Sequence, residues 1–152
     1  MNVVYNNLLR GFDDFNYGEK KIYSKQIGIL IEEINKHELP EDIVVYRYTH
    51  KRLFRYLFKD LKVKVGNIFI DKGFMSTTLV PELLREFAKS HRYNCILKLY
   101  LPKGTKGIYL KFDKSILNEQ EILLPSNSKF KLLKKYFSFK YGIVYEFELI
   151  SQ

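Results

Sequence analysis

The sequence of 152 residues has very little cysteine, with Cys95 as its only one. A disulfide within the chain is therefore excluded, and no second thiol stands at a metal-ligand spacing. His37, His50 and His91 share no ligand spacing either, so the sequence predicts no metal site. The cellular compartment stays undetermined, because a secreted protein can lack disulfides as readily as a cytosolic one.

Long hydrophobic runs are also missing. No apolar stretch approaches the roughly 18 residues that identify a membrane-spanning helix. The first eleven residues include Asn2, Asn6, Asn7 and Arg10, which do not resemble the apolar region of a signal peptide. We therefore expect neither a transmembrane segment nor a secretion signal in this chain.

Internal repeats, low-complexity tracts and linkers rich in proline, glycine or serine are absent as well, so we expect one domain over residues 1–152. Hydrophobic residues make up 46% of the chain, and tyrosine and phenylalanine contribute twelve each, which is a globular composition. The net charge of +9 favours a polyanionic partner. Nucleic acid, an acidic protein surface and a pyrophosphate-bearing cofactor all fit that charge, which does not choose among them.

The order of elements predicts an α+β domain, helical over about residues 1–40 and mainly β over 41–152. Pro40 ends the helical part, because proline disfavours a helical conformation in the residue before it. Ahead of Pro40, five apolar residues recur on one helix face: Tyr23, Ile27, Leu30, Ile31 and Ile34. A β-rich run then leads to Arg47. A short helix is expected from Pro81, burying Leu83, Leu84 and Phe87. Helices first and strands afterwards favour α+β over repeated βαβ units.

Three segments carry side chains capable of chemistry. Arg47 ends a strand, Ser76 and Thr78 share one face of the next strand motif, and Glu119 and Glu121 lie two residues apart. Each is weak evidence alone, because a strand-end arginine is usually a surface ion-pair partner. The carboxylate spacing recurs in Glu146-Phe147-Glu148, on a strand whose other face is apolar, where a solvated face explains it.

Together the segments are more specific. The order Arg47, Gly73-Phe74-Met75-Ser76-Thr77-Thr78, then Glu119-Gln120-Glu121 resembles the Arg / Ser-Thr-Ser / Glu-x-Glu signature of bacterial and phage mono-ADP-ribosyltransferases, with the actin-modifying and C3-like toxins most similar. The likeness runs from about Tyr5 to Leu149. It implies two packed, mainly antiparallel sheets with N-terminal helices, and NAD in the cleft between the sheets.

The resemblance also implies an activity and its residues. NAD would be cleaved at the nicotinamide–ribose bond and ADP-ribose passed to an acceptor. Glu121 would stabilise the ribose oxocarbenium ion through the 2′-hydroxyl, because that interaction strengthens as positive charge develops. Ser76 would hold Glu121, and Arg47 would meet the pyrophosphate, whose geometry suits a guanidinium.

Further NAD contacts follow from the same likeness. Tyr48 would offer its backbone to the nicotinamide amide, while Thr77 and Thr78 would belong to the NAD pocket. Phe87 stands where the family commonly places an aromatic against nicotinamide, although a core position beside Leu83 explains it equally well. No metal is implied.

Glu119 bears on the acceptor. In the resembling families a glutamate here accompanies arginine acceptors, since a carboxylate can orient a guanidinium and remove its proton. We therefore expect a protein arginine as acceptor, with nucleic acid as an open possibility, a monomer, and no membrane partner. The resemblance implies action in the cytoplasm of the producing, infected or target cell.

Two alternatives stay open. One is an NAD glycohydrolase with water as its acceptor. The other is a non-catalytic nucleic-acid-binding module in which lysines and aromatic residues grip a phosphate backbone, using Lys129, Lys131, Lys134, Lys135 and Lys140 with Phe130, Tyr136, Phe137 and Phe139. We favour instead a solvated lysine face over aromatic core positions.

Overall fold

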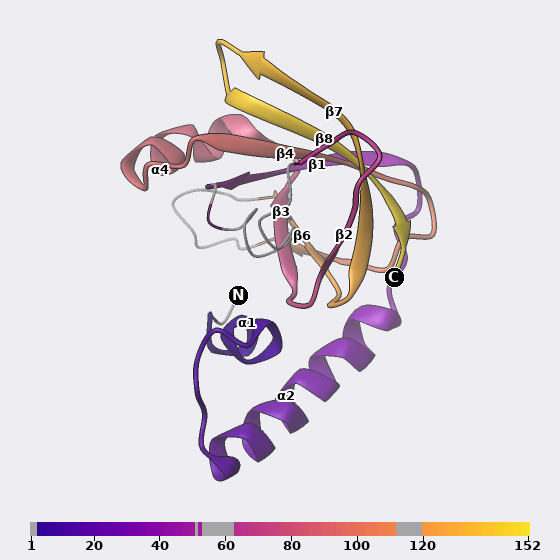
Figure 1. Ribbon diagram of the computed structural model, residues 1–152. Coiled ribbons are helices and arrows are strands. Elements are labelled where there is room, and N and C mark those ends of the chain that lie inside the picture. The colour runs from indigo at the N-terminus through magenta and orange to yellow at the C-terminus, as the bar shows by residue number, and fades with distance from the viewer. Residues whose placement is uncertain (1–2, 51, 53–62, 112–119) are drawn as a thin grey trace.

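The computed structural model describes residues 3–50, 52, 63–111 and 120–152, and its elements form an α+β domain (Figure 1). In chain order they are α1 (Val3–Arg10), α2 (Tyr17–Asn35), β1 (Ile43–Thr49), β2 (Ile68–Asp71), β3 (Met75–Thr78), η1 (Pro81–Leu84), α4 (Arg85–Ser90), β4 (Cys95–Leu101), β5 (Ile108–Lys111), β6 (Gln120–Leu124), β7 (Ser128–Ser138) and β8 (Gly142–Ser151). The predicted fold class, with helices first and strands afterwards, is confirmed.

Helix α2 forms where the apolar stripe predicted it. Its start is a capping box, in which the Asn16 side chain accepts from the backbone of Glu19 and the Glu19 carboxylate accepts from the backbone of Asn16. Ile27 and Ile34 of the stripe are buried. Neither α2 nor another helix in the described ranges is long and apolar enough to cross a membrane.

The strands form one eight-stranded sheet in the order β2-β7-β8-β4-β1-β3-β6-β5, rather than two separate sheets. The β4–β8 pair is parallel and the other pairs are antiparallel. Strand β3 pairs with β6 along its whole length but meets β1 only where Tyr46 lies opposite Thr78. Because of this single link, the two sheets expected from the sequence form two ends of one continuous sheet. The link lies between β1 and β3, the strands that carry Arg47 and Ser76.

The core has two clusters. The larger one spans this junction, because it joins Val45 of β1 and Phe147 of β8 to Met75 of β3 and Leu124 of β6. The smaller cluster packs Ile34 of α2 against Leu123 of β6. Figure 1 shows α1 and α2 together on one side of the strands. The helices therefore cover the three-stranded end of the sheet and leave α1 beside the junction.

The short helical segment after β3 buries different residues from those expected. Pro81 and Ala88 are buried, whereas Leu83 and Phe87 are each 41% exposed. The chain begins this segment as the tight helix η1 and continues as α4. The change of helical pitch shifts the buried face, because three residues per turn in η1 give way to 3.6 in α4. Phe87 is thereby left accessible.

Candidate active site

Three neighbouring strands bring the motif segments together. Arg47 lies on β1, Ser76 on β3 and Glu121 on β6, and these strands are consecutive in the sheet. The segments are far apart in the sequence, so only the β1–β3–β6 order makes them adjacent. Glu119, the first carboxylate of the pair, lies outside the described residues.

Glu121 is held by Ser76 across the β3–β6 pair. Thr78 lies directly opposite Glu121 in the register, so Ser76, two residues earlier, is a diagonal neighbour on the same face. The Ser76 hydroxyl donates to Oε1 of Glu121 at 2.5 Å. Glu121 is 5% exposed. The orientation of the Glu121 carboxylate is therefore fixed by Ser76. Ser76 itself lines a hollow next to β1 and α1.

The two threonines beside Ser76 stabilise the strand ends. The Thr77 hydroxyl donates to the backbone carbonyl of Ile122 at 2.7 Å, which ties β3 to β6 from the opposite face. The Thr78 hydroxyl accepts from the backbone N–H of Val80 at 3.1 Å, just before η1. Both side chains are buried. Threonine in place of a second serine thus keeps the hydroxyl that fixes the turn into η1.

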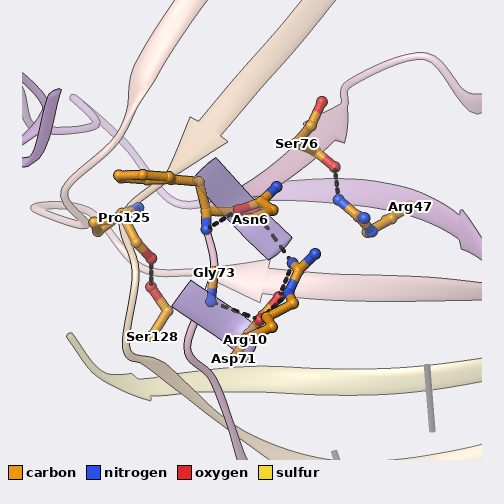
Figure 2. Close-up of polar contacts among 9 residues, drawn as sticks. Asn6, Arg10, Arg47, Asp71, Gly73, Ser76, Pro125 and Ser128 are labelled. Atoms are coloured by element: carbon orange, nitrogen blue, oxygen red, sulfur yellow. Dashed lines mark hydrogen bonds and ion pairs between the residues drawn. The ribbon is translucent and has the colours of Figure 1, made fainter. Parts of the chain in front are cut away.

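Arg47 points from β1 to β3. Its Nη1 donates to the backbone carbonyl of Ser76 at 3.0 Å, as Figure 2 shows. Burial lowers the pKa of the Arg47 guanidinium, and the nearby carboxylate of Asp71 opposes that shift. An arginine stays charged even with such a shift. Arg47 is therefore a half-buried cation beside the Ser76–Glu121 pair.

Helix α1 supplies a second arginine to this region (Figure 2). Arg10 forms a two-pronged ion pair with Asp71, with Nε–Oδ1 at 2.9 Å and Nη2–Oδ2 at 2.7 Å. Asn6, one turn earlier, accepts from the backbone N–H of Phe74 at 2.8 Å. Gly73 makes this approach possible, because a Cβ there would lie 2.6 Å from Nε of Arg10. The helix is thus fastened directly to the start of the Ser76 strand.

Two adjoining hollows lie between α1, β1 and α4. The first, of about 400 Å³, is lined by Arg47, Ser76 and Phe87 together with Leu84, Thr77 and Thr78. The second, of about 380 Å³, extends towards Thr49, His50 and Arg52. Five residues line both: Asn7, Arg10, Arg47, Tyr48 and Tyr93. The arrangement is a two-part groove, in the size range of ligand sites, with two guanidinium groups where its halves meet.

A family model described as ADP-ribosyltransferase exoenzyme matches residues 4–142. The chain belongs to this family. Among solved structures, the Plx2a toxin of Paenibacillus larvae aligns with a TM-score of 0.75 at 22% identity, covering 97% of this chain and 79% of Plx2a. C3stau2 from S. aureus, solved with NAD, aligns with a TM-score of 0.72 at 21% identity over 87% of this chain and 73% of its own. These two likenesses concern the fold.

Curated relatives of the family are much longer proteins. The NAD(+)–arginine ADP-ribosyltransferase EFV of Enterococcus faecalis is 30% identical over 128 residues, which is 82% of this chain but 24% of EFV. The mono(ADP-ribosyl)transferase SpvB of Salmonella typhimurium is 41% identical over 68 residues, 45% of this chain and 10% of SpvB. This ADP-ribosyltransferase domain therefore spans about a quarter and a tenth of these two relatives.

Sequence reasoning missed the contribution of α1 to the groove of this exoenzyme-family domain. Arg10 and Asn7 line both hollows, yet neither belongs to a strand motif. The available signal was the four-residue spacing of Asn6 and Arg10, which places them on one helix face. The structure also resolves the open choice at Phe87 against a core position, because the exposed ring lines the first hollow.

The side chain of Tyr48 lies away from that of Arg47, because neighbouring residues of a strand face opposite ways. Its phenolic oxygen is buried and has no hydrogen-bonding partner among the described residues. Tyr48 nevertheless lines both hollows.

No group of three or more His, Cys, Asp or Glu residues that could hold a metal is found in the described ranges. The lysine-rich segment is only partly a solvated face over core aromatics. Phe130 is fully buried, as that interpretation requires, but Phe137 and Phe139 are exposed. Both lie at the end of the β7–β8 hairpin, Phe137 at the edge of the core and Phe139 in the turn.

Proposed function

We propose that this domain is a mono-ADP-ribosyltransferase that cleaves NAD at the nicotinamide–ribose bond and transfers ADP-ribose to arginine. The observation that carries the proposal is the Ser76–Glu121 hydrogen bond at the wall of a groove that also holds Arg47. Family membership and the arginine acceptor named for EFV support it.

In the proposed reaction, nicotinamide leaves with the electron pair of the glycosidic C–N bond, and the ribose becomes an oxocarbenium ion. Glu121 accepts a hydrogen bond from the ribose 2′-hydroxyl, and this bond strengthens as the charge develops. Ser76 acts through Glu121 as a positioning residue. A guanidinium nitrogen of the acceptor then bonds to the anomeric carbon, and Glu119 takes its proton.

We assign the two hollows of the groove to the two halves of NAD. In this proposal nicotinamide stacks on Phe87 in the first hollow, with its amide on the backbone of Tyr48. The adenosine half occupies the second hollow. Arg47 and Arg10 lie where the hollows meet, where they would neutralise the pyrophosphate. Thr77 and Thr78 keep β3 in place behind the ribose.

Replacing Arg47 by lysine tests the pyrophosphate contact. We expect the KM for NAD to rise by roughly 10-fold or more, because a charge-assisted hydrogen bond contributes about 1.5–3 kcal/mol, while kcat changes little. The measurement is steady-state nicotinamide release. Arg85→Lys, an exposed change on α4, is the matched control and should leave KM unchanged. An equal KM for Arg47→Lys and wild type would remove Arg47 from the NAD site.

Replacing Glu119 by glutamine tests the acceptor. Transfer of labelled ADP-ribose from NAD to agmatine, a free guanidinium compound, should fall by about 10²-fold or more through loss of the general base. Hydrolysis of NAD by water should persist in part, since Glu121 is unchanged. Equal loss of both activities would contradict the acceptor role of Glu119. Hydrolysis without any transfer in the wild type would favour the glycohydrolase.

A further inference from the structure

The end of the β7–β8 hairpin carries two exposed aromatic rings, one near the end of the strand ladder and one in the turn that follows Ser138. Figure 1 shows the two strands reaching this turn at the top of the view. The ladder continues to the end of the hairpin, through Phe137 opposite Ile143 and Ser138 opposite Gly142. Phe137 is 66% exposed and Phe139 is 100% exposed. Their ring centroids lie 5.5 Å apart at an interplanar angle of 81°.

The hairpin behind this tip is strongly basic. The segment from Ser128 to Gly142 contains five lysines and no acidic residue: Lys129, Lys131, Lys134, Lys135 and Lys140. Lys134 and Lys135 are adjacent in the strand, so they extend from opposite faces of the hairpin. Their ammonium groups lie over the rings of Tyr136, at 5.1 Å, and Tyr145, at 5.5 Å. Neither forms an ion pair within the described ranges.

The tip is already fixed in position. Lys140 forms an ion pair with Glu82 of η1 at 2.7 Å, and the Tyr141 hydroxyl donates to the same carboxylate at 2.5 Å. These contacts attach the turn to the helical segment that precedes α4. A partner of the tip would therefore meet a preformed surface, which lowers the entropic cost of binding.

We propose that this hairpin tip docks onto a lipid bilayer that carries anionic headgroups. Phe137 and Phe139 would enter the boundary between headgroups and acyl chains, where exposed aromatic side chains are stabilised. Lys134 and Lys135 would reach the anionic headgroups on either side of the inserted tip. The hairpin has an apolar end and a lysine on each of its two faces. This arrangement suits contact between the end of the hairpin and a flat anionic surface.

Other macromolecules fit the same features less well. A pocket of an acidic protein would contact one face of the hairpin, whereas the free lysines lie on both faces. Single-stranded nucleic acid stacks on rings spaced along a basic groove. Here the two rings contact each other edge to face, and neither lines either hollow of the groove. The sequence expectation of no membrane partner rested on the lack of a spanning segment, which does not bear on surface docking.

Docking would place the groove close to the membrane. Phe137, Ile143, Cys95 and Thr49 lie side by side across β7, β8, β4 and β1. Thr49 lines the second hollow. Three strand spacings of about 4.8 Å separate the first and last of these residues, or roughly 14 Å. If the proposed transferase activity holds, membrane-bound acceptors would be the favoured ones, but the docking itself does not depend on that activity.

The test is co-sedimentation of the full chain with phosphatidylcholine vesicles that contain or lack phosphatidylserine. We expect binding only with phosphatidylserine, and weaker binding as salt rises. The pair Phe137→Ser with Phe139→Ser should abolish sedimentation. The pair Lys134→Gln with Lys135→Gln should weaken partitioning by about 25-fold, since each lysine near the surface is worth about 1 kcal/mol, or roughly fivefold.

The matched control is Tyr17→Ser with Ile22→Ser, which removes two exposed apolar side chains from α2. It should bind vesicles like wild type. All variants should keep the melting temperature and, without vesicles, the NAD cleavage of wild type, because the altered residues lie outside the groove. No binding to phosphatidylserine vesicles, or equal binding by the phenylalanine variant, would overturn the proposal. The proposal would also be overturned if the protein bound single-stranded RNA in a salt-sensitive way but did not bind vesicles, and if the phenylalanine variant lost that RNA binding.

Discussion

Glu121→Gln should reduce nicotinamide release from NAD by about 10²- to 10³-fold, the effect of removing one preorganised electrostatic contact to a transition state. Glutamine has nearly the same shape and can still accept from the Ser76 hydroxyl, which donates to Glu121 at 2.5 Å. The variant loses only the negative charge that opposes the oxocarbenium ion. Transfer to an acceptor should fall in parallel, because both products pass through the same bond cleavage.

The measurement is the kcat of nicotinamide release for purified wild type and variant, alongside their melting temperatures. Glu148→Gln is the matched control, since Glu148 belongs to the second Glu-x-Glu sequence, on β8, which β4 and β1 separate from β3, and Glu148 lines neither hollow of the groove. It should retain wild-type release. Full activity in Glu121→Gln, or an equal loss in Glu148→Gln, would contradict the role of Glu121 as the carboxylate that stabilises the oxocarbenium ion. A variant that is inactive but melts much earlier would need the Ser76 contact to be re-examined by structure.

The comparison of these two carboxylate pairs indicates what the sequence could predict. Alternation of apolar residues placed Phe147 in the core, as observed. Glu146 lies on the other face of β8, but that face is not solvated as expected, because its side chain is 15% exposed and accepts from the Tyr136 hydroxyl. The faces of β3 and β6 also followed from alternation, so Ser76 and Glu121 could be expected to meet once those strands were paired. Local periodicity is fixed by backbone geometry and needs no knowledge of the rest of the chain.

The parts that escaped prediction depend on long-range pairing. The single link between Tyr46 and Thr78 makes one sheet from two, and no local pattern marks it. The exposure of Phe87 follows from a change in helical pitch after Pro81, which the apolar spacing does not reveal. Phe139 is an apolar residue of the kind found in cores and is fully exposed because it lies in the turn between β7 and β8. Such features are set by where elements end, the least determined property of a sequence.

The docking of α1 is the other feature that only the folded chain reveals, and it predicts a large effect on stability. Asp71 is 1% exposed, accepts both prongs of Arg10 and also accepts from the backbone N–H of Gly73 at 2.9 Å. Asp71→Ala should lower the free energy of unfolding by about 3–5 kcal/mol, because it leaves a buried guanidinium without its counter-charge. Denaturant titration followed by far-UV circular dichroism measures this change.

A second variant separates the charge from the fold. Arg10→Met combined with Asp71→Leu removes both charges and should recover most of the lost stability, since replacing a whole buried pair with apolar residues is often nearly neutral. Asp13→Asn, an exposed acid that also contacts α1 through Asn7, is the control and should cost less than about 1 kcal/mol. If the single and double variants were equally unstable, the packing of α1, rather than the ion pair, would hold the helix.

The double variant also reports on the groove. Arg10 lines both hollows beside Arg47, so the restored fold would lack one of the two cations where the halves meet. We expect the KM for NAD to rise in the stable double variant while Glu121 still cleaves the NAD that binds. An unchanged KM would mean that Arg10 serves to anchor α1 and that Arg47 alone meets the pyrophosphate. The stability of the fold and the binding of NAD are thus measured on the same protein, and either prediction can be contradicted while the other holds.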